Sequence, residues 1–180
     1  GAILGKLRQI VSGPRRISEN LTVITPLVLP IPGSRAARQI NRRLLVRQIR
    51  SVLRDLPDRP VQLWSFAPDV DYLVGRLGEE AVVYYCVDEF SEFAGYDREA
   101  ILSVEARLAQ SADLVVTTSQ TLFESKRSLN PRTVLVTHGV DYEHFASATR
   151  EDVKPADELV DLPRPILGFW GMIQDWVDID

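Results

Sequence analysis

The sequence predicts an α/β fold: a Rossmann-like parallel sheet with helices on both faces, followed by the start of a second domain. The first observation is the apolar, β-branched and aromatic run at 81–87 (AVVYYCV), which is typical of a strand buried in a parallel sheet. The second is the alternation of such runs with helix-like segments. The third is the composition, because 180 residues with 45% hydrophobic and 26% charged side chains can form a globular core.

The amino-terminal third contains one clear helix. Residues 1–20 show no steady period and are interpreted as a loop or a loose helix, and 20–25 (NLTVIT) as a short strand before a proline-rich linker. From Ser34 to Leu56, apolar residues recur at spacings of three and four, which predicts a helix with one apolar stripe. Ser34 is suited to cap this helix, and two prolines follow its end.

Strands and helices then alternate as far as residue 137. The expected strands are 61–66, 81–87, 113–118 and 133–137, and the expected helices are 68–77, 97–111 and 120–128, the last capped by Ser119. The polar stretch from 150 to 165 holds three prolines, which indicates a linker. We therefore expect a first domain at 1–148, a linker at 149–165 and the first strand and loop of a second domain at 166–180.

Basic side chains concentrate near the amino terminus. Residues 1–60 hold 12 Lys/Arg against 3 Asp/Glu, a net +9, whereas residues 61–180 carry a net −13. This pattern favours either a solvated charged face or a surface for anionic lipid head groups. No aromatic platform or reader motif for nucleic acid accompanies it. The arginines of the predicted helix are Arg35, Arg38, Arg42, Arg43, Arg47, Arg50 and Arg54.

The cysteine content and the hydropathy pattern indicate a cytoplasmic protein. Cys86 is the single cysteine, so the chain can form no internal disulfide, and it is interpreted as a small buried hydrophobe rather than a nucleophile. No apolar run approaches the ~20 residues that a membrane span needs, and the first residues lack the features of a signal peptide. If the arginines bind lipid, we expect the protein at the inner face of the membrane.

Two acids follow directly after the apolar run at 81–87. Ligands of open α/β sheets bind beyond the carboxyl ends of the strands. Asp88 and Glu89 are therefore candidate catalytic residues, and Phe90 and Phe93 lie next to them in the sequence. A strand that ends in a solvated acidic loop would give the same pattern.

Other motifs, present or absent, indicate which classes of function this chain can have. The dinucleotide fingerprint and the P-loop are both absent, which argues against a dehydrogenase or a nucleotide triphosphatase. His138-Gly139 follows a predicted strand, where it could contact a substrate or form an exposed turn. The D-x-D matches at 69–71 and 178–180 are too short to indicate a metal site in an acid-rich chain, so no metal is expected.

Four stretches, in this order, resemble group-1 (family 4-like) glycosyltransferases of the GT-B fold. They are VVYYCVDEFSEFAG, ADLVVTTSQTL, VLVTHGVDYEHF and PRPILGFWGMIQDWVDID, and the similarity extends over about residues 20–180. The sequence is most similar to the branch that includes teichuronic-acid and other surface-polysaccharide enzymes.

The resemblance implies two Rossmann-like domains that face each other across a cleft. The amino-terminal domain would bind the acceptor, and the carboxy-terminal domain would bind the nucleotide sugar. Asp88 and Glu89 would orient the acceptor hydroxyl. Gly168 and Gly171 match glycines whose backbone lies near the donor phosphates. The acceptor site would also include Phe90, Phe93, Ser119, His138 and Gly139.

The sequence also departs from the family pattern. His138 stands where asparagine is usual, and Val87 stands where many relatives have a catalytic histidine. The family's first strand and most of its donor domain have no counterpart, so we expect this chain to be the acceptor-side part of a longer enzyme and inactive alone.

The implied function is hexosyl transfer from a nucleotide-diphosphate sugar, without a metal, in the synthesis of cell-envelope or extracellular polysaccharide or glycolipid. The acceptor would be a lipid-linked or free saccharide. The alternatives are a non-catalytic GT-B-like binding module and a sugar-nucleotide epimerase of the same fold.

Overall fold

The computed structural model describes residues 13–31, 34–56, 59–150, 152–154, 156–169 and 171. The chain divides into two compact units, residues 1–136 and 137–180. This boundary lies before the predicted end of the first domain at 148. The two units are described separately below.

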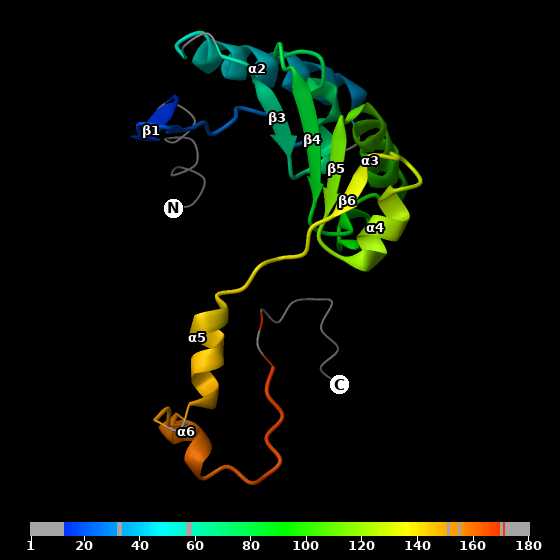
Figure 1. Ribbon diagram of the computed structural model, residues 1–180. Coiled ribbons are helices and arrows are strands. Elements are labelled where there is room, and N and C mark those ends of the chain that lie inside the picture. The colour runs from blue at the N-terminus through cyan, green and yellow to red at the C-terminus, as the bar shows by residue number, and fades with distance from the viewer. Residues whose placement is uncertain are drawn as a thin grey trace. The chain divides into compact units, whose positions relative to one another are not determined.

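A four-stranded parallel sheet forms the centre of the first unit and confirms the predicted α/β fold (Figure 1). Its strand order is β3-β4-β5-β6. The register places Cys86 beside Thr117, so β4 and β5 end at the same edge of the sheet. The strands are β3 (Gln62–Ser65), β4 (Ala81–Cys86), β5 (Leu114–Thr117) and β6 (Thr133–Leu135).

Side-chain caps fix where the helices of the first unit begin. The Ser34 and Ser119 hydroxyls each accept a hydrogen bond from the backbone N–H three residues later, at 3.2 and 3.3 Å, which confirms both predicted caps. The predicted helix at 68–77 is a shorter 3-10 helix, because Gly75 adopts a left-handed φ of +74° after it. The helices are α2 (Arg35–Leu53), η1 (Pro68–Leu73), η2 (Phe90–Glu92), α3 (Arg98–Ser111) and α4 (Gln120–Lys126).

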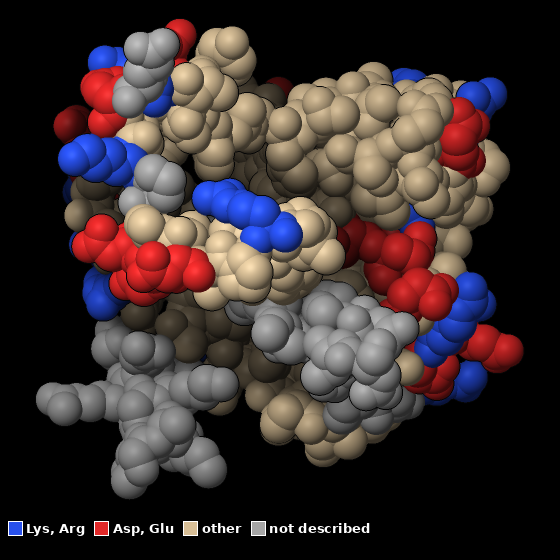
Figure 2. Space-filling model, turned by 90° about the horizontal axis from the view of Figure 1, so that it is seen from below, with Lys and Arg blue, Asp and Glu red and all other residues tan. Residues whose placement is uncertain are grey.

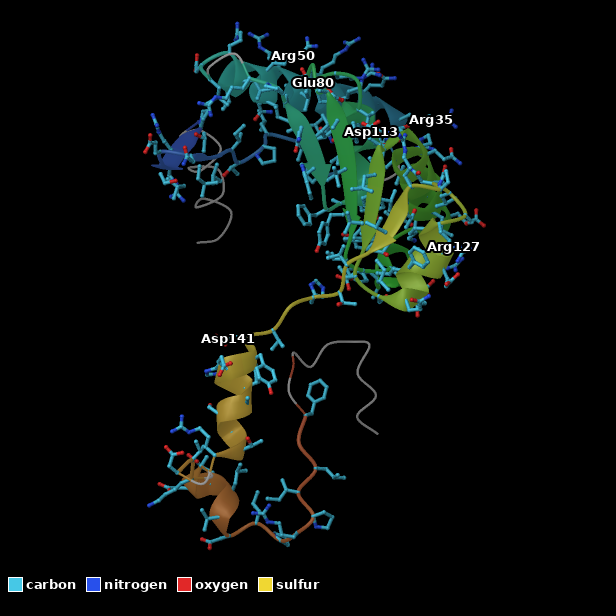
Figure 3. The ribbon with its side chains drawn as sticks, viewed as in Figure 1. Arg35, Arg50, Glu80, Asp113, Arg127 and Asp141 are labelled. Atoms are coloured by element: carbon cyan, nitrogen blue, oxygen red, sulfur yellow. The ribbon has the colours of Figure 1, made fainter. Side chains whose placement is uncertain are left out.

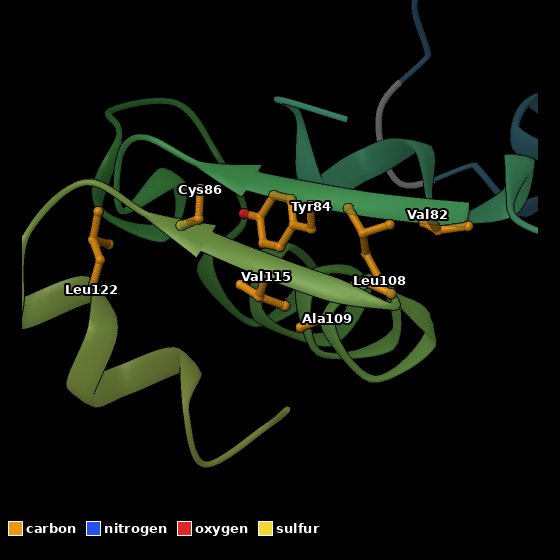
Figure 4. Close-up of a cluster of buried hydrophobic side chains, with 8 residues drawn as sticks. Val82, Tyr84, Cys86, Leu108, Ala109, Val115 and Leu122 are labelled. Carbon is orange, nitrogen blue, oxygen red and sulfur yellow. The ribbon is translucent and has the colours of Figure 1, made fainter. Parts of the chain in front are cut away.

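The hydrophobic core lies between the sheet and two helices, α3 and α4. Both helices pack on the same face, because the strand order advances in one direction and right-handed crossovers then place every connection on one side. Figure 4 shows Tyr84 at the centre of this core, with its hydroxyl directed toward Cys86. The buried cluster consists of Val82, Tyr84, Cys86, Leu108, Ala109, Ala112, Val115 and Leu122.

The other face of the sheet carries exposed aromatic side chains. Trp64 and Phe66 alternate with the core-facing Ser65 and are 47% and 54% exposed. Phe66 stacks on Tyr85 with ring centroids 5.1 Å apart. Helices were expected on both faces of the sheet. In the described part of the chain, α3 and α4 instead pack on the same face. Figure 2 shows the molecule from below, with Lys and Arg (blue) and Asp and Glu (red) among residues of other kinds (tan).

A two-stranded antiparallel hairpin precedes α2. Its strands are β1 (Arg15–Ser18) and β2 (Leu21–Val23). The strand predicted at 20–25 is confirmed in its central part, whereas the loop or loose helix predicted for 1–20 is wrong at 15–18. The sequence gives no strand signal there, because every residue of this short hairpin is exposed and no apolar alternation is needed.

In its described residues, the second unit contains three short helical segments. They are α5 (Tyr142–Ala146), η3 (Ser147–Thr149) and α6 (Asp157–Val160), so α6 lies within the predicted linker. Residues 166–169 form no strand, and residues 172–180 lie outside the described part of the chain. A strand needs a hydrogen-bonded neighbouring strand, and residues 166–169 have none. The first strand of the second domain, predicted within 166–180, is therefore not formed in its described residues. Within the described ranges, no helix is long and apolar enough to cross a bilayer.

Candidate functional site

The loops that follow β4 and β5 leave the sheet at the same edge. Asp88 and Glu89 come after β4, and Ser119 comes after β5. The Thr118 hydroxyl donates a hydrogen bond to the backbone carbonyl of Val87 at 3.2 Å, which ties the two loops together. The structure thus places Asp88 and Ser119 on neighbouring loops at the carboxyl edge, where ligands of parallel sheets bind.

The Glu89 carboxylate is occupied by two partners from the protein. Its Oε2 lies 2.9 Å from Lys126 Nζ, and its Oε1 accepts a hydrogen bond from the Ser91 hydroxyl at 2.9 Å. The Glu89 side chain is 32% exposed and bonds to Lys126, which is 1% exposed, so Glu89 lies between the solvent and the core. Glu89 therefore holds its own loop against α4.

Behind Glu89 lies a buried ionic network that sequence reasoning missed. Lys126 Nζ lies 2.8 Å from Glu105 Oε2, and both side chains are 1% exposed. The Tyr84 hydroxyl donates to Glu105 Oε1 at 2.6 Å. One signal was available in the sequence: Glu105 interrupts the apolar stripe of α3 between Ile101 and Leu108. A carboxylate at such a position needs a buried partner.

The network shifts the pKa of Glu89 and that of Lys126 toward their charged forms. Burial alone would raise the pKa of Glu89, but hydrogen bonds from Lys126 and Ser91 outweigh it and lower the pKa. Burial would lower the pKa of Lys126, but its bonds to Glu105 and Glu89 raise it overall. Burial raises the pKa of Tyr84 and brings that of Cys86 to about 11. Glu89 is thus a poor proton acceptor at neutral pH.

The lowered pKa of Glu89 predicts how the free energy of unfolding depends on pH in the acid range. Because its folded pKa lies below its unfolded value near 4.5, its contribution is present above that value and is lost as the pH falls through the folded pKa. We expect Glu89→Gln, which cannot titrate, to show a shallower loss of unfolding free energy below about pH 4.5 than the wild type. Urea denaturation across the acid range measures this slope. Equal slopes, with exposed Glu99→Gln as the control, would contradict it.

Asp88 differs from its neighbour because its carboxylate has no partner in the part of the chain that the structure describes. It is exposed, and its side chain makes no hydrogen bond or ion pair with any residue that the structure describes. Its backbone carbonyl accepts a hydrogen bond from the Cys86 thiol at 3.5 Å, which anchors the start of the loop. Of the two predicted catalytic acids, Asp88 is the one available to a ligand.

Aromatic rings flank this loop. Phe90 and Phe93 lie with ring centroids 5.3 Å apart, and Phe93 meets the exposed Tyr96 edge-on at 6.2 Å. Gly95 has a φ of +83°, a conformation that other residues rarely adopt, and it turns the chain between the last two rings. The Asp88 carboxylate can accept hydrogen bonds, and it lies beside aromatic rings. This combination suits a ligand that carries hydroxyl groups on an apolar frame.

The remaining predicted site residues fall into two groups. Ser119 is exposed, but its hydroxyl caps α4. His138, Gly139, Gly168 and Gly171 are exposed and belong to the second unit, so their participation in a site with Asp88 stays a prediction. Asp141, which follows His138-Gly139, caps α5 by accepting a hydrogen bond from the His144 N–H at 3.0 Å.

The carboxylate of Asp71, part of the first D-x-D match, is used within the fold. It accepts hydrogen bonds from Arg38 of α2 and from Arg107 of α3, the latter at 2.8 Å. The second match, at 178–180, lies outside the described residues. Among the residues described, no three His, Cys, Asp or Glu side chains gather in a way that could hold a metal ion.

Comparisons with protein-family models and with curated proteins found no match to this chain. The resemblance to glycosyltransferases therefore rests on the four sequence stretches themselves.

Proposed function

We propose that this chain is the acceptor-binding side of a sugar-nucleotide-dependent glycosyltransferase of the GT-B type. The observation that carries the proposal is the carboxylate of Asp88 at the carboxyl edge of β4, which has no partner among the described residues and lies beside a glutamate held in place by a buried lysine. The order of the four sequence stretches supports the same reading.

In this proposal, Asp88 accepts a hydrogen bond from the acceptor hydroxyl and orients its oxygen toward the anomeric carbon of the donor. The new glycosidic bond forms as the bond between the sugar and the diphosphate breaks. In retaining enzymes of the family that this sequence resembles, the donor phosphate can take the hydroxyl proton. Asp88 then needs only to position the hydroxyl, and no strong protein base is required.

The neighbours of Asp88 take supporting roles. Glu89 fixes the loop through Lys126, so the position of Asp88 depends on the buried network. Phe90 and Phe93 offer apolar surface to a sugar ring. His138 and Gly139 complete the acceptor side in this proposal, and the backbone at Gly168 and Gly171 meets the donor phosphates.

The proposed setting is the synthesis of cell-envelope or extracellular polysaccharide or glycolipid. The donor is a nucleotide-diphosphate sugar, no metal takes part, and the acceptor is a saccharide or a lipid-linked saccharide. A cytoplasmic location at the inner face of the membrane, through the arginines of α2, is part of the same proposal.

A turnover assay separates this proposal from its alternatives. The full-length protein is incubated with radiolabelled nucleotide sugars, with and without saccharide and lipid-linked acceptors. Transfer of label that requires an acceptor supports a transferase. Conversion of one nucleotide sugar into another without an acceptor supports an epimerase of the same fold. Saccharide binding without any turnover supports a non-catalytic binding module.

A further inference from the structure

Six arginines surround a hollow on the first unit. The hollow has a volume of about 650 Å³. Four of its arginines come from successive turns of α2, a fifth, Arg54, caps the carboxyl end of that helix, and the sixth, Arg76, comes from the turn before β4. Among the described residues that line the hollow, Val46 is the one that is not an arginine. The arginines are Arg42, Arg43, Arg47, Arg50, Arg54 and Arg76.

The structure divides the seven arginines that the sequence grouped on one basic face. Arg38 is used within the fold: it donates to Asp71 and to the Asp69 carbonyl and lies over the Tyr72 ring. Arg35 is exposed but does not line the hollow. Arg76 does line the hollow, and the helical pattern could not predict this because Arg76 lies outside α2.

The hydrogen bonds of the turn that carries Arg76 involve its backbone, and the Arg76 guanidinium has no partner among the described residues. Gly75 and Gly78 both adopt left-handed φ values, +74° and +75°, on either side of Arg76. The nearby Glu79 carboxylate accepts hydrogen bonds from the backbone N–H groups of Gly75 and Leu77. Arg50 Nε donates to the Arg76 carbonyl at 2.8 Å, which joins the turn to α2.

None of the described residues that line the hollow is acidic, although the Glu79 carboxylate lies in the turn that carries Arg76. The side chains of Arg43, Arg47, Arg54 and Arg76 form no hydrogen bond or ion pair in the described part of the chain. Arg43 and Arg47 are four residues apart on α2, as are Arg50 and Arg54, and like charges at this spacing destabilise a helix. An anion bound in the hollow would relieve this repulsion.

We propose that the arginine hollow is a binding site for an anion that carries clustered phosphate groups. Arginine guanidinium groups form paired hydrogen bonds to phosphate oxygens, and all six cations here are arginine. Several guanidinium groups around one hollow match an anion with two or more phosphates better than a single carboxylate. The phosphates can belong to a free anion or to a lipid head group.

This site is distinct from the candidate acceptor edge. Arg76 precedes β4, whereas Asp88 follows it, so the hollow lies toward the opposite end of the strand, about 20 Å away by strand length. Figure 3 labels Arg50 of α2 and Glu80, the residue that immediately precedes β4. The proposal therefore does not depend on the transferase activity.

The test measures pyrophosphate binding to the full chain by calorimetry, with sulfate at equal ionic strength for comparison. The variant is Arg43→Gln with Arg47→Gln, because neither side chain has a partner among the described residues. The control is Arg35→Gln with Arg59→Gln, which removes the same charge outside the hollow. Figure 3 shows Arg35 toward the other end of α2 from Arg50.

We expect saturable binding of pyrophosphate to the wild type and to the control, and affinity at least about tenfold weaker in the hollow variant. Pyrophosphate should raise the unfolding midpoint of the wild type more than that of the hollow variant. Without any anion, the hollow variant should be at least as stable as the control. No binding, equal weakening in both variants, or equally tight sulfate binding would overturn the proposal.

A vesicle arm identifies the source of the phosphate. Co-sedimentation is measured with phosphatidylcholine vesicles that contain phosphatidic acid, or phosphatidylglycerol at matched charge. Preference for phosphatidic acid, lost in the hollow variant and displaced by pyrophosphate, assigns the hollow to a lipid phosphate. Pyrophosphate binding without vesicle binding assigns it to a free anion. Vesicle binding that pyrophosphate does not displace, and that both variants weaken equally, would contradict a discrete site.

Discussion

Replacing Lys126 by methionine is expected to lower the free energy of unfolding by about 3–5 kcal/mol. Lys126 and Glu105 are both 1% exposed and lie 2.8 Å apart at the closest atoms. Methionine fills a similar volume but cannot neutralise Glu105, which would remain buried with hydrogen bonds from the uncharged Tyr84 hydroxyl and Cys86 thiol. Urea denaturation at neutral pH measures the loss.

Two further variants isolate the charge effect from a packing effect. Arg127→Gln changes the next residue, whose surface pair with Glu124 spans 3.2 Å, and should cost less than about 0.5 kcal/mol. Adding Glu105→Gln to Lys126→Met removes the uncompensated charge and should recover much of the lost stability. A single variant that loses less than about 1 kcal/mol, or a double variant that loses more than the single one, would contradict the network.

Cys86 is expected to react with thiol reagents at least about a hundredfold more slowly in the folded protein than in the urea-unfolded chain at about pH 8. Its pKa of about 11 lies two units above the ordinary value of 9.0, and the thiolate is the reactive form. Its side chain is also fully buried beneath α3 and α4, so a reagent can reach it only when the core opens.

The single cysteine makes this labelling measurement simple to interpret. A small model thiol in the same urea concentration corrects for the effect of the solvent on the reagent. Folded-state labelling as fast as in the unfolded chain would mean that the core between the sheet and its helices opens readily. It would also reopen the reading of Cys86 as a nucleophile, which the sequence interpretation set aside.

Local patterns predicted the elements that local chemistry determines. Ser34 and Ser119 were identified as caps because serine at a helix start has a specific backbone donor to accept from, and both bonds are formed. The apolar run at 81–87 identified β4 because a short β-branched and aromatic run with so few polar residues is typical of a strand buried in a parallel sheet.

What the sequence could not show depends on residues far apart in the chain. Asp88 and Glu89 are equivalent in a pattern of two acids after a strand. They are distinguished by Lys126, which is 37 residues from Glu89 and follows no local signal. Likewise, Arg76 joins the arginines of α2 only because the fold places its turn beside that helix. Contacts of this kind require the sheet order, which the sequence alone did not give.

The central claim is that Asp88 orients an acceptor while Glu89 holds the loop, and turnover by Asp88→Asn in the full-length protein tests it most directly. Asparagine keeps the shape of the side chain but loses its charge. We expect the rate of acceptor-dependent sugar transfer to fall at least about a hundredfold, because an acceptor hydroxyl that is held in the wrong position reacts more slowly by about that factor. Donor affinity and the unfolding midpoint should stay close to wild type, since the Asp88 side chain has no partner in the described residues. Exposed Glu99→Gln is the matched control. Transfer by Asp88→Asn at the wild-type rate, or its loss together with folding stability, would contradict the account.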